Sequence, residues 1–320
     1  MKRILTVLAA TLLAGGALAQ QAAWPSKPVK MVVPFTAGSA TDIIARTVGE
    51  SMARSLGQPV LVENKPGAGG TIGAAQVAKS DPDGYTVLIV SSGHVLNPAI
   101  YPNLPYDTLK DLTGVTPLAS VPNVLVVSPT KGYKTVADVI AAAKARPGQM
   151  NYASAGVGSA THMNAEKFKL RAGIDVQHVP FKGTPDAISD VIGGRNDWFF
   201  APMASALPLI KDGKVQALAV SSATRSASLP NVPTTIEAGV PGSDYTLWVG
   251  MIVPSATPPA IVRRLHEEAL KAVNSPDVKA RLTALGAETM PMEPAAFNAY
   301  IRSEMEAAAL IAKAANLKAQ

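Results

Sequence analysis

Short apolar runs alternate with amphipathic segments along most of this chain. Between the first two runs, Ile44, Val48 and Met52 recur at the spacing of one helix face. Thr135 precedes an expected helix over residues 136–145, and Thr184 precedes Pro185 at another helix start. The runs read as strands covered on both faces, at residues 29–33, 60–62, 86–90, 124–127, 177–181 and 216–220. This alternation predicts an α/β fold of doubly wound, parallel sheets with helices on both faces.

The C-terminal third differs, because helical patterns follow one another without strands between them. Pro258 and Pro259 open one helix, and two more are expected at residues 277–285 and 295–315. Their apolar stripes need an existing surface to cover, so we expect them to pack on the first domain. About 300 residues argue for two domains. We predict domain I at residues 20–122 plus 224–320 and domain II at residues 123–223, with hinges near Pro122 and Ala223.

The first 19 residues have the pattern of a secretory signal peptide. Lys2 and Arg3 precede a short apolar run, and small residues end at Ala19, after which we expect cleavage. The apolar run is too short to span a membrane, which takes about 20 residues. We therefore expect an exported protein that is free of the membrane, with an uncleaved anchor as the alternative.

Composition excludes several kinds of site. Loss of Lys2 and Arg3 would lower the formal net charge from +6 to +4, and no Lys/Arg cluster interleaves with aromatic residues, so nucleic acid is not an expected partner. The chain has no cysteine, and its four histidines lack the spacing of a zinc site. The glycine-rich segment 67–73 only approaches a dinucleotide fingerprint. We expect neither a metal nor a cofactor, and we expect a monomer.

The best candidate for a binding site is the loop between the strand at residues 29–33 and the next helix. Its residues are mostly small or carry hydroxyl groups, and the helix that follows directs free N–H groups and its positive end toward the loop. The expected ligand contacts are Phe35, Thr36, Ala37, Gly38, Ser39, Ala40 and Thr41. The pattern predicts a seat for a small anion.

A second loop has the same character and follows a strand-like segment at residues 150–153. Its candidate contacts are Ser154, Gly156, Gly158, Ser159, Ala160 and Thr161. One alternative is that Ser159 only caps its own helix. Two such loops in separate domains would grip one ligand from both sides of a cleft.

Further candidates lie at the carboxyl ends of strands, where open α/β sheets bind ligands. Ser91 and Ser92 follow the strand at residues 86–90, with His94 as an alternative packed residue. Lys182 follows the strand at residues 177–181 and would either contact an anion or remain solvated.

Enzyme signals are weak. Ser159 and His162 are the only neighbouring nucleophile–base pair, and capping already occupies the serine. A secreted two-domain α/β hydrolase acting on a small acid remains the alternative on these residues alone.

Several longer segments resemble one family when taken together. They are residues 34–46, 62–70, 81–85, 104–107, 156–162, 180–183 and 229–239, and they occur in the family's order along the whole expected mature chain. The chain is similar to the Bug or TctC-like extracytoplasmic solute receptors of tripartite tricarboxylate transporters. The resemblance implies a two-lobed, periplasmic-binding-protein-like (Venus flytrap) fold that closes on a small carboxylate or amino acid. It also implies delivery to integral-membrane permease subunits, and no catalysis.

Two positions depart from the family pattern. Many members have a glycine where Ser39 stands, and many have an acidic residue where this chain has Ala201 and Pro202. Ala201 is thereby an expected ligand contact, and the missing carboxylate favours a mono- or dicarboxylate ligand over an amino acid. A sensing role beside a histidine kinase remains a second alternative to transport.

Overall fold

Two sheets joined by one long strand form the frame of the molecule. The computed structural model describes residues 24–318, so the predicted signal peptide lies outside the described residues. The strands are β1 Val29–Val33, β2 Val60–Asn64, β3 Thr86–Ser91, β4 Leu112–Val127, β5 Asn151–Ser154, β6 Gln177–Pro180, β7 Trp198–Pro202, β8 Gln216–Val220, β9 Thr246–Pro254 and β10 Glu288–Thr289. Each of the six predicted strands is confirmed. Five differ by at most two residues at an end, whereas the segment predicted at residues 124–127 is only the last part of β4.

The predicted helices also lie close to their observed positions, whereas α3 and α7 were not predicted. They are α1 Ala40–Leu56, α2 Thr71–Ala78, α3 Asn97–Ile100, α4 Val136–Ala145, α5 Ala160–Ala172, α6 Thr184–Ile192, α7 Met203–Lys211, α8 Pro259–Asn274, α9 Pro276–Ala284 and α10 Pro294–Ala314. Thr135 caps α4 through a reciprocal pair of hydrogen bonds with Asp138. At α6 the prediction was one residue late, because Gly183 is the N-cap and Thr184 is already helical.

The strands run in the order β2–β1–β3–β9–β4–β7–β5–β6, with β10 and β8 also paired to β4. β1 pairs in parallel with β2 and β3, and β5 pairs in parallel with β6 and β7. However, β9 is antiparallel to β3 and β4, and β4 is antiparallel to β7 and β8. The expectation of parallel sheets was therefore wrong for the centre of the molecule, where the chain passes between the sheets.

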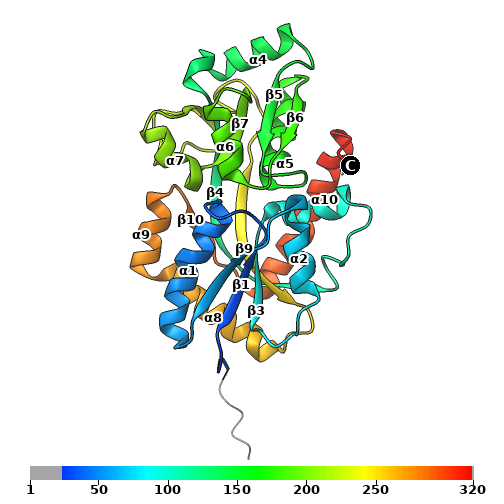
Figure 1. The fold of residues 1–320 in the computed structure, drawn as a ribbon, viewed down its shortest axis with the longest axis vertical. Coiled ribbons are helices and arrows are strands. Elements are labelled where there is room, and N and C mark those ends of the chain that lie inside the picture. Colours follow the sequence, from blue (N-terminus) through cyan, green and yellow to red (C-terminus); the bar gives the residue numbers. More distant parts are fainter. Residues whose placement is uncertain (1–23, 319–320) are drawn as a thin grey trace, which may run out of the picture.

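Strand β4 belongs to both sheets. Residues 112–122 pair with β9, and residues 123–127 pair with β7 and β8. Figure 1 shows β4 running along the molecule between one lobe with α1, α2 and α8 and another with α4, α5 and α6. The predicted boundary after Pro122 thus falls inside a continuous strand. The division of the chain at residues 122 and 223 stays a prediction.

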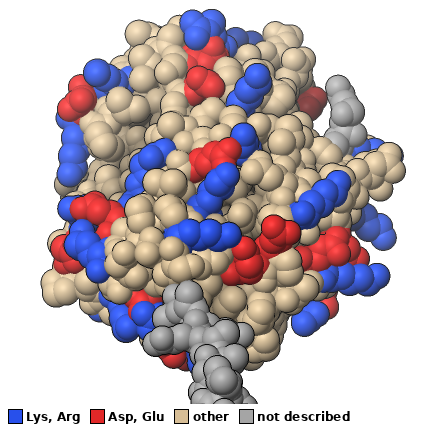
Figure 2. All heavy atoms as spheres, turned by 60° about the horizontal axis from the view of Figure 1, so that its bottom comes forward, with Lys and Arg blue, Asp and Glu red and all other residues tan. Residues whose placement is uncertain are grey.

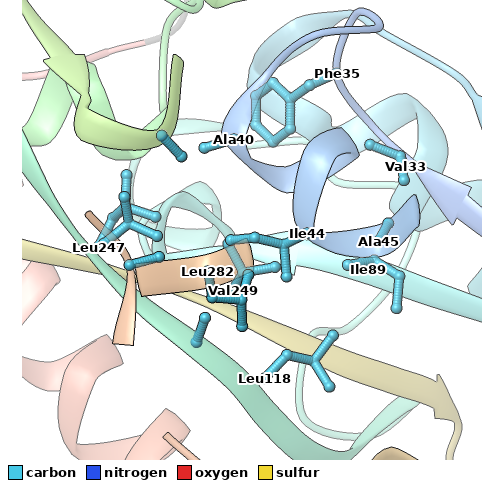
Figure 3. Packing of buried hydrophobic residues seen from close by; sticks show 14 of the residues in the cluster. Val33, Phe35, Ala40, Ile44, Ala45, Ile89, Leu118, Leu247, Val249 and Leu282 are labelled. Atoms are coloured by element: carbon cyan, nitrogen blue, oxygen red, sulfur yellow. The ribbon is translucent and has the colours of Figure 1, made fainter. Parts of the chain in front are cut away.

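The three C-terminal helices cover the first sheet, as predicted. Helices α8 and α10 pack on β4, α9 packs on β10, and α8 also contacts α1. Figure 3 shows Ile44 and Ala45 of α1 among Ile89, Leu118 and Val249 of this sheet. These side chains are fully buried and belong to one apolar cluster. Their burial supplies the hydrophobic stabilisation that fixes the start of α1 against the sheet.

Phe297 of α10 lies over two glycines on neighbouring strands. A Cβ atom on Gly114 of β4 or on Gly250 of β9 would come within 2.6 Å of its ring. Phe297 is fully buried and meets Trp248 edge-on, with ring centroids 5.3 Å apart. The missing side chains thus create the space that this ring fills.

Phe297→Ala should lower the free energy of unfolding by about 3–5 kcal/mol, because it opens a cavity that the strands cannot close. Urea unfolding followed by circular dichroism measures the change. Leu310→Ala on the same helix is the control, since Leu310 is 71% exposed, and should change stability by about 0.5 kcal/mol or less. Equal losses in the two variants would contradict this account of the packing.

Candidate functional site

The start of α1 carries backbone N–H groups that the helix does not use. Ser39 is the N-cap, and its Oγ accepts from the Asp42 N–H at 3.3 Å. The Ile43 N–H donates to the Ser39 carbonyl. Within the described residues, the N–H groups of Ala40 and Thr41 have no such partner in the protein. The positive end of the α1 dipole lies at the same place.

A buried carboxylate holds the loop before α1 in shape. Asp42 accepts from the Gly38 N–H at 2.9 Å and from Asn64 Nδ2 at 2.9 Å, and Arg46 pairs with it at 3.0 Å. Asn64 Nδ2 also donates to the Phe35 carbonyl at 3.0 Å. Burial works to raise the pKa of Asp42, but these donors outweigh it and hold the pKa below its ordinary value. Asp42 is therefore a fixed anion that shapes the loop.

The start of α5 repeats this arrangement. Residues 38–41 and 158–161 have the same sequence, Gly-Ser-Ala-Thr. Ser159 caps α5 by accepting from the His162 N–H at 3.3 Å, and Thr161 Oγ1 accepts from the Ala155 N–H at 2.9 Å. The N–H groups of Ala160 and Thr161 stay without a protein partner in the part of the chain that the structure describes.

The two helix starts face one cavity between the lobes. Its lining comes from both of them, from strand ends and loops of both lobes and from the start of α6. It consists of Phe35, Ser39, Ala40, Thr41, Ser91, Ala155, Ser159, Ala160, Thr161, Thr184, Pro202 and Leu247. The space open to the centres of water molecules is about 20 Å³, room for one or two waters. None of these lining residues is charged, so the polar groups that they offer are hydroxyls and backbone amides.

The lobes are closed around this cavity. Tyr101 Oη donates to the Val157 carbonyl at 2.8 Å, and Ser205 Oγ donates to the Gly38 carbonyl at 3.2 Å. Gly69 has a φ of +60° and packs so tightly that a Cβ atom there would lie 2.0 Å from Val157 O. A side chain at Gly69 would hold the lobes apart.

The predicted site residues fall into two groups. Eight of them line the cavity, namely Phe35, Ser39, Ala40, Thr41, Ser91, Ser159, Ala160 and Thr161. The others lie outside its lining, namely Thr36, Ala37, Gly38, Ser92, Ser154, Gly156, Gly158, Lys182 and Ala201.

Several residues of the second group have a structural role or line another part of the surface. Ser92 is buried against the Tyr245 hydroxyl at 2.7 Å, and Ala201 lies in the core of β7. Ser154 Oγ meets His178 Nε2 at 2.6 Å. Lys182 lines a separate open groove with Gly156.

Sequence reasoning missed Ala155, Thr184, Pro202 and Leu247 as lining residues. Thr184 and Pro202 stand at a helix start and a strand end, which is a usable signal. No sequence signal marks Leu247, because its position depends on how β9 crosses between the sheets.

Two stacked histidines support the second loop from behind. The rings of His162 and His178 are 4.0 Å apart. His162 Nδ1 accepts from the Gly158 N–H at 3.2 Å, so the ring needs a free lone pair there. Burial, and next to it the Lys169 charge, lowers the pKa of His162 to about 4. Burial and the neighbouring His162 lower the pKa of His178 to about 3.

These pKa values predict a loss of stability in mild acid. An unfolded histidine has a pKa of about 6.5, so below that pH the unfolded chain binds more protons than the native one. The stabilisation is complete above pH 6.5 and falls by up to about 1.4 kcal/mol per pH unit for each histidine until the native pKa is reached.

Urea unfolding between pH 7 and pH 4.5 measures this slope. The double variant His162→Asn/His178→Gln keeps an acceptor at each position but cannot gain a charge, so its stability should fall less steeply. The same slope in both proteins would contradict the assignment.

Charge on the surface is mixed. On the face drawn in Figure 2, Lys and Arg are interspersed with Asp and Glu and form no single basic patch. No helix among the described residues is long and apolar enough to cross a membrane. Residues 24–318 also contain no group of three or more His, Asp or Glu placed to hold a metal ion.

The chain was compared with known proteins. Residues 44–317 match the model of the family described as the tripartite tricarboxylate transporter family receptor, TctC. Protein BugT of Bordetella pertussis is 36% identical over 310 residues, which cover 96% of this chain and 95% of BugT.

Two solved structures are similar over nearly their whole length. R. palustris Rpa4515 with adipate has a TM-score of 0.89 at 33% identity, covering 92% of this chain and 99% of that one. MatC (Rpa3494) from Rhodopseudomonas palustris with bound malate has a TM-score of 0.86 at 33% identity, covering 90% and 99%.

These matches confirm the resemblance seen in the sequence, and with it the two-lobed binding-protein fold. They exclude the hydrolase alternative. In agreement with this, Ser159 Oγ accepts from the backbone N–H of His162, whereas the His162 ring accepts from the Gly158 N–H. The chain therefore belongs to the TctC family and is a solute-binding receptor without catalytic activity.

Proposed function

We propose that this protein is a periplasmic receptor that captures a small carboxylate anion between the starts of α1 and α5. The observation that carries the proposal is the pair of Gly-Ser-Ala-Thr helix starts facing one enclosed cavity. Each offers two unpartnered N–H groups, a hydroxyl-bearing N-cap and the positive end of a helix dipole. An anion placed there is the complementary ligand.

The free energy that these groups contribute is comparable to the free energy that micromolar binding needs. A partly buried helix start contributes up to about 2 kcal/mol, and each hydrogen bond to a charged group about 1.5–3 kcal/mol. Micromolar affinity needs about 8 kcal/mol net of the ordering cost. One loop alone falls short of that, whereas two loops with several donors reach it.

The lining favours a simple organic acid over an amino acid. Pro202 lies where many family members carry an acidic residue, and no carboxylate lines the cavity to pair with an ammonium group. The similar structures with adipate and malate support the same class of ligand. We further propose delivery to the permease subunits of a tripartite tricarboxylate transporter, in line with the family, after entry through lobe opening about the β4 crossing.

Binding of mono- and dicarboxylates should raise the melting temperature in a thermal-shift screen. A ligand at 100 times its Kd stabilises the native state by about 2.7 kcal/mol. The panel contains adipate, malate and the common amino acids. A preference for an amino acid over every carboxylate tested would contradict the ligand class.

Ser159→Leu should abolish the thermal shift, because it removes a donor and fills the cavity. It also removes an N-cap, which costs about 1 kcal/mol by itself. Thr135→Leu is the matched control, since it removes the cap of α4 far from the cavity. The control should melt earlier but keep the full ligand shift. A full ligand shift in Ser159→Leu would contradict the site.

A further inference from the structure

A second hollow lies in the lobe of the first sheet, and it shares no lining residue with the cavity between the lobes. Its volume, by the same measure, is about 370 Å³, within the range of small-molecule sites. The lining comes from the start of β4, the β9–α8 connection and the first turns of α8 and α10. It consists of Thr113, Gly114, Ser255, Thr257, Pro259, Val262, Arg263, His266, Glu293 and Pro294. We call it the α8–α10 pocket.

Two long helices begin at this pocket without a side-chain cap. Pro258 is the N-cap of α8 and Glu293 is the N-cap of α10, and neither side chain bonds to a helix N–H group. The first N–H groups of both helices therefore lack a side-chain cap, and the one charge at either N-cap is the exposed carboxylate of Glu293. This feature favours negative charge but does not by itself define a site.

Buried polar atoms without partners supply the independent observation. Within the described residues, Nδ1 of His266 has no hydrogen-bond partner and Nε2 has only the Glu293 carboxylate 3.4 Å away, although the histidine is only 6% exposed. Thr257 is 4% exposed, and its Oγ1 is also without a partner. A buried polar group left unpaired is costly, so a ligand that forms hydrogen bonds with both residues would be stabilised in this pocket.

The charges indicate what that ligand is. Arg263 is exposed and forms no ion pair with any described residue. Glu293 reaches His266 from outside, with Oε1 3.4 Å from Nε2 and a side chain that is 79% exposed. The Glu293 carboxylate thus occupies the position beside His266 that the carboxylate of a ligand would take. Pro259, Val262 and Pro294 form apolar walls next to these groups.

We propose that the α8–α10 pocket binds a small organic carboxylate. Arg263, Thr257 and His266 would donate hydrogen bonds to the carboxylate group, and the apolar walls would contact its carbon chain. The exposed carboxylate of Glu293 competes for the same position. A carboxylate matches every donor in the pocket, whereas a divalent metal would find only His266 and Glu293 as ligands. The proposal is independent of the function proposed for the cavity between the lobes.

The test is a titration of the protein with succinate, followed by the NMR signals of individual residues. Signals of Thr257, Val262 and His266 should shift and saturate, whereas signals of Thr41 and Thr161 report the cavity between the lobes. In the Ser159→Leu variant the pocket signals should still saturate. The experiment therefore distinguishes loss of binding at the α8–α10 pocket from loss of binding at the cavity between the lobes.

Two exposed positions test the proposal without disturbing the core. Arg263→Ala should weaken succinate binding at the pocket at least tenfold, and Arg302→Ala, an exposed arginine on α10, should leave it unchanged. Glu293→Gln should tighten binding several-fold, because it removes the competing charge.

Three results would overturn the proposal. They are pocket signals that do not saturate by 50 mM succinate, equal effects of the two arginine variants, and weaker binding in Glu293→Gln. Saturable binding of Zn²⁺ that Glu293→Gln abolishes, without any response to succinate, would show a cation site in place of an anion site.

Discussion

The candidate site depends on the backbone N–H groups at the starts of two helices, which have no hydrogen-bond partner within their own helix. Ala40, Thr41, Ala160 and Thr161 present four of them to one small cavity. Exposed to water, such groups contribute little, because water competes for them. Enclosed between two lobes, they form a positive site without a positive side chain. Under the function proposed above, such a site would bind an anion through backbone and hydroxyl donors, without a full positive charge opposite it.

Rigid supports behind the loops make this arrangement possible. Asp42 and Asn64 tie down the loop before α1, and His162 and Ser154 tie down the loop before α5. The two supports differ chemically although the helix starts are identical. A carboxylate serves the first loop and neutral imidazoles serve the second, so acid should affect the second loop first.

Close approach of the lobes requires small residues. Gly69 meets the backbone at Val157, and Gly183 meets the Thr36 side chain, at distances that leave no room for a Cβ atom. These glycines come from loops on both lobes, so both surfaces contribute to the fit. This close approach leaves room for only one or two waters in the cavity.

Local sequence determined most elements and both helix starts. Apolar runs and capping residues located β1 and β8 at their observed bounds and α4 at its cap, because these signals act over a few residues. Strand β9 was not predicted, since Gly250 interrupts its pattern. The first part of β4 was also missed, since Pro117 stands inside it, next to a register shift. Only the tertiary structure decided that these two strands pair in the antiparallel sense and carry the chain between the lobes. That crossing decides which residues line the cavity, because the convergence of segments more than a hundred residues apart depends on packing that no local pattern records.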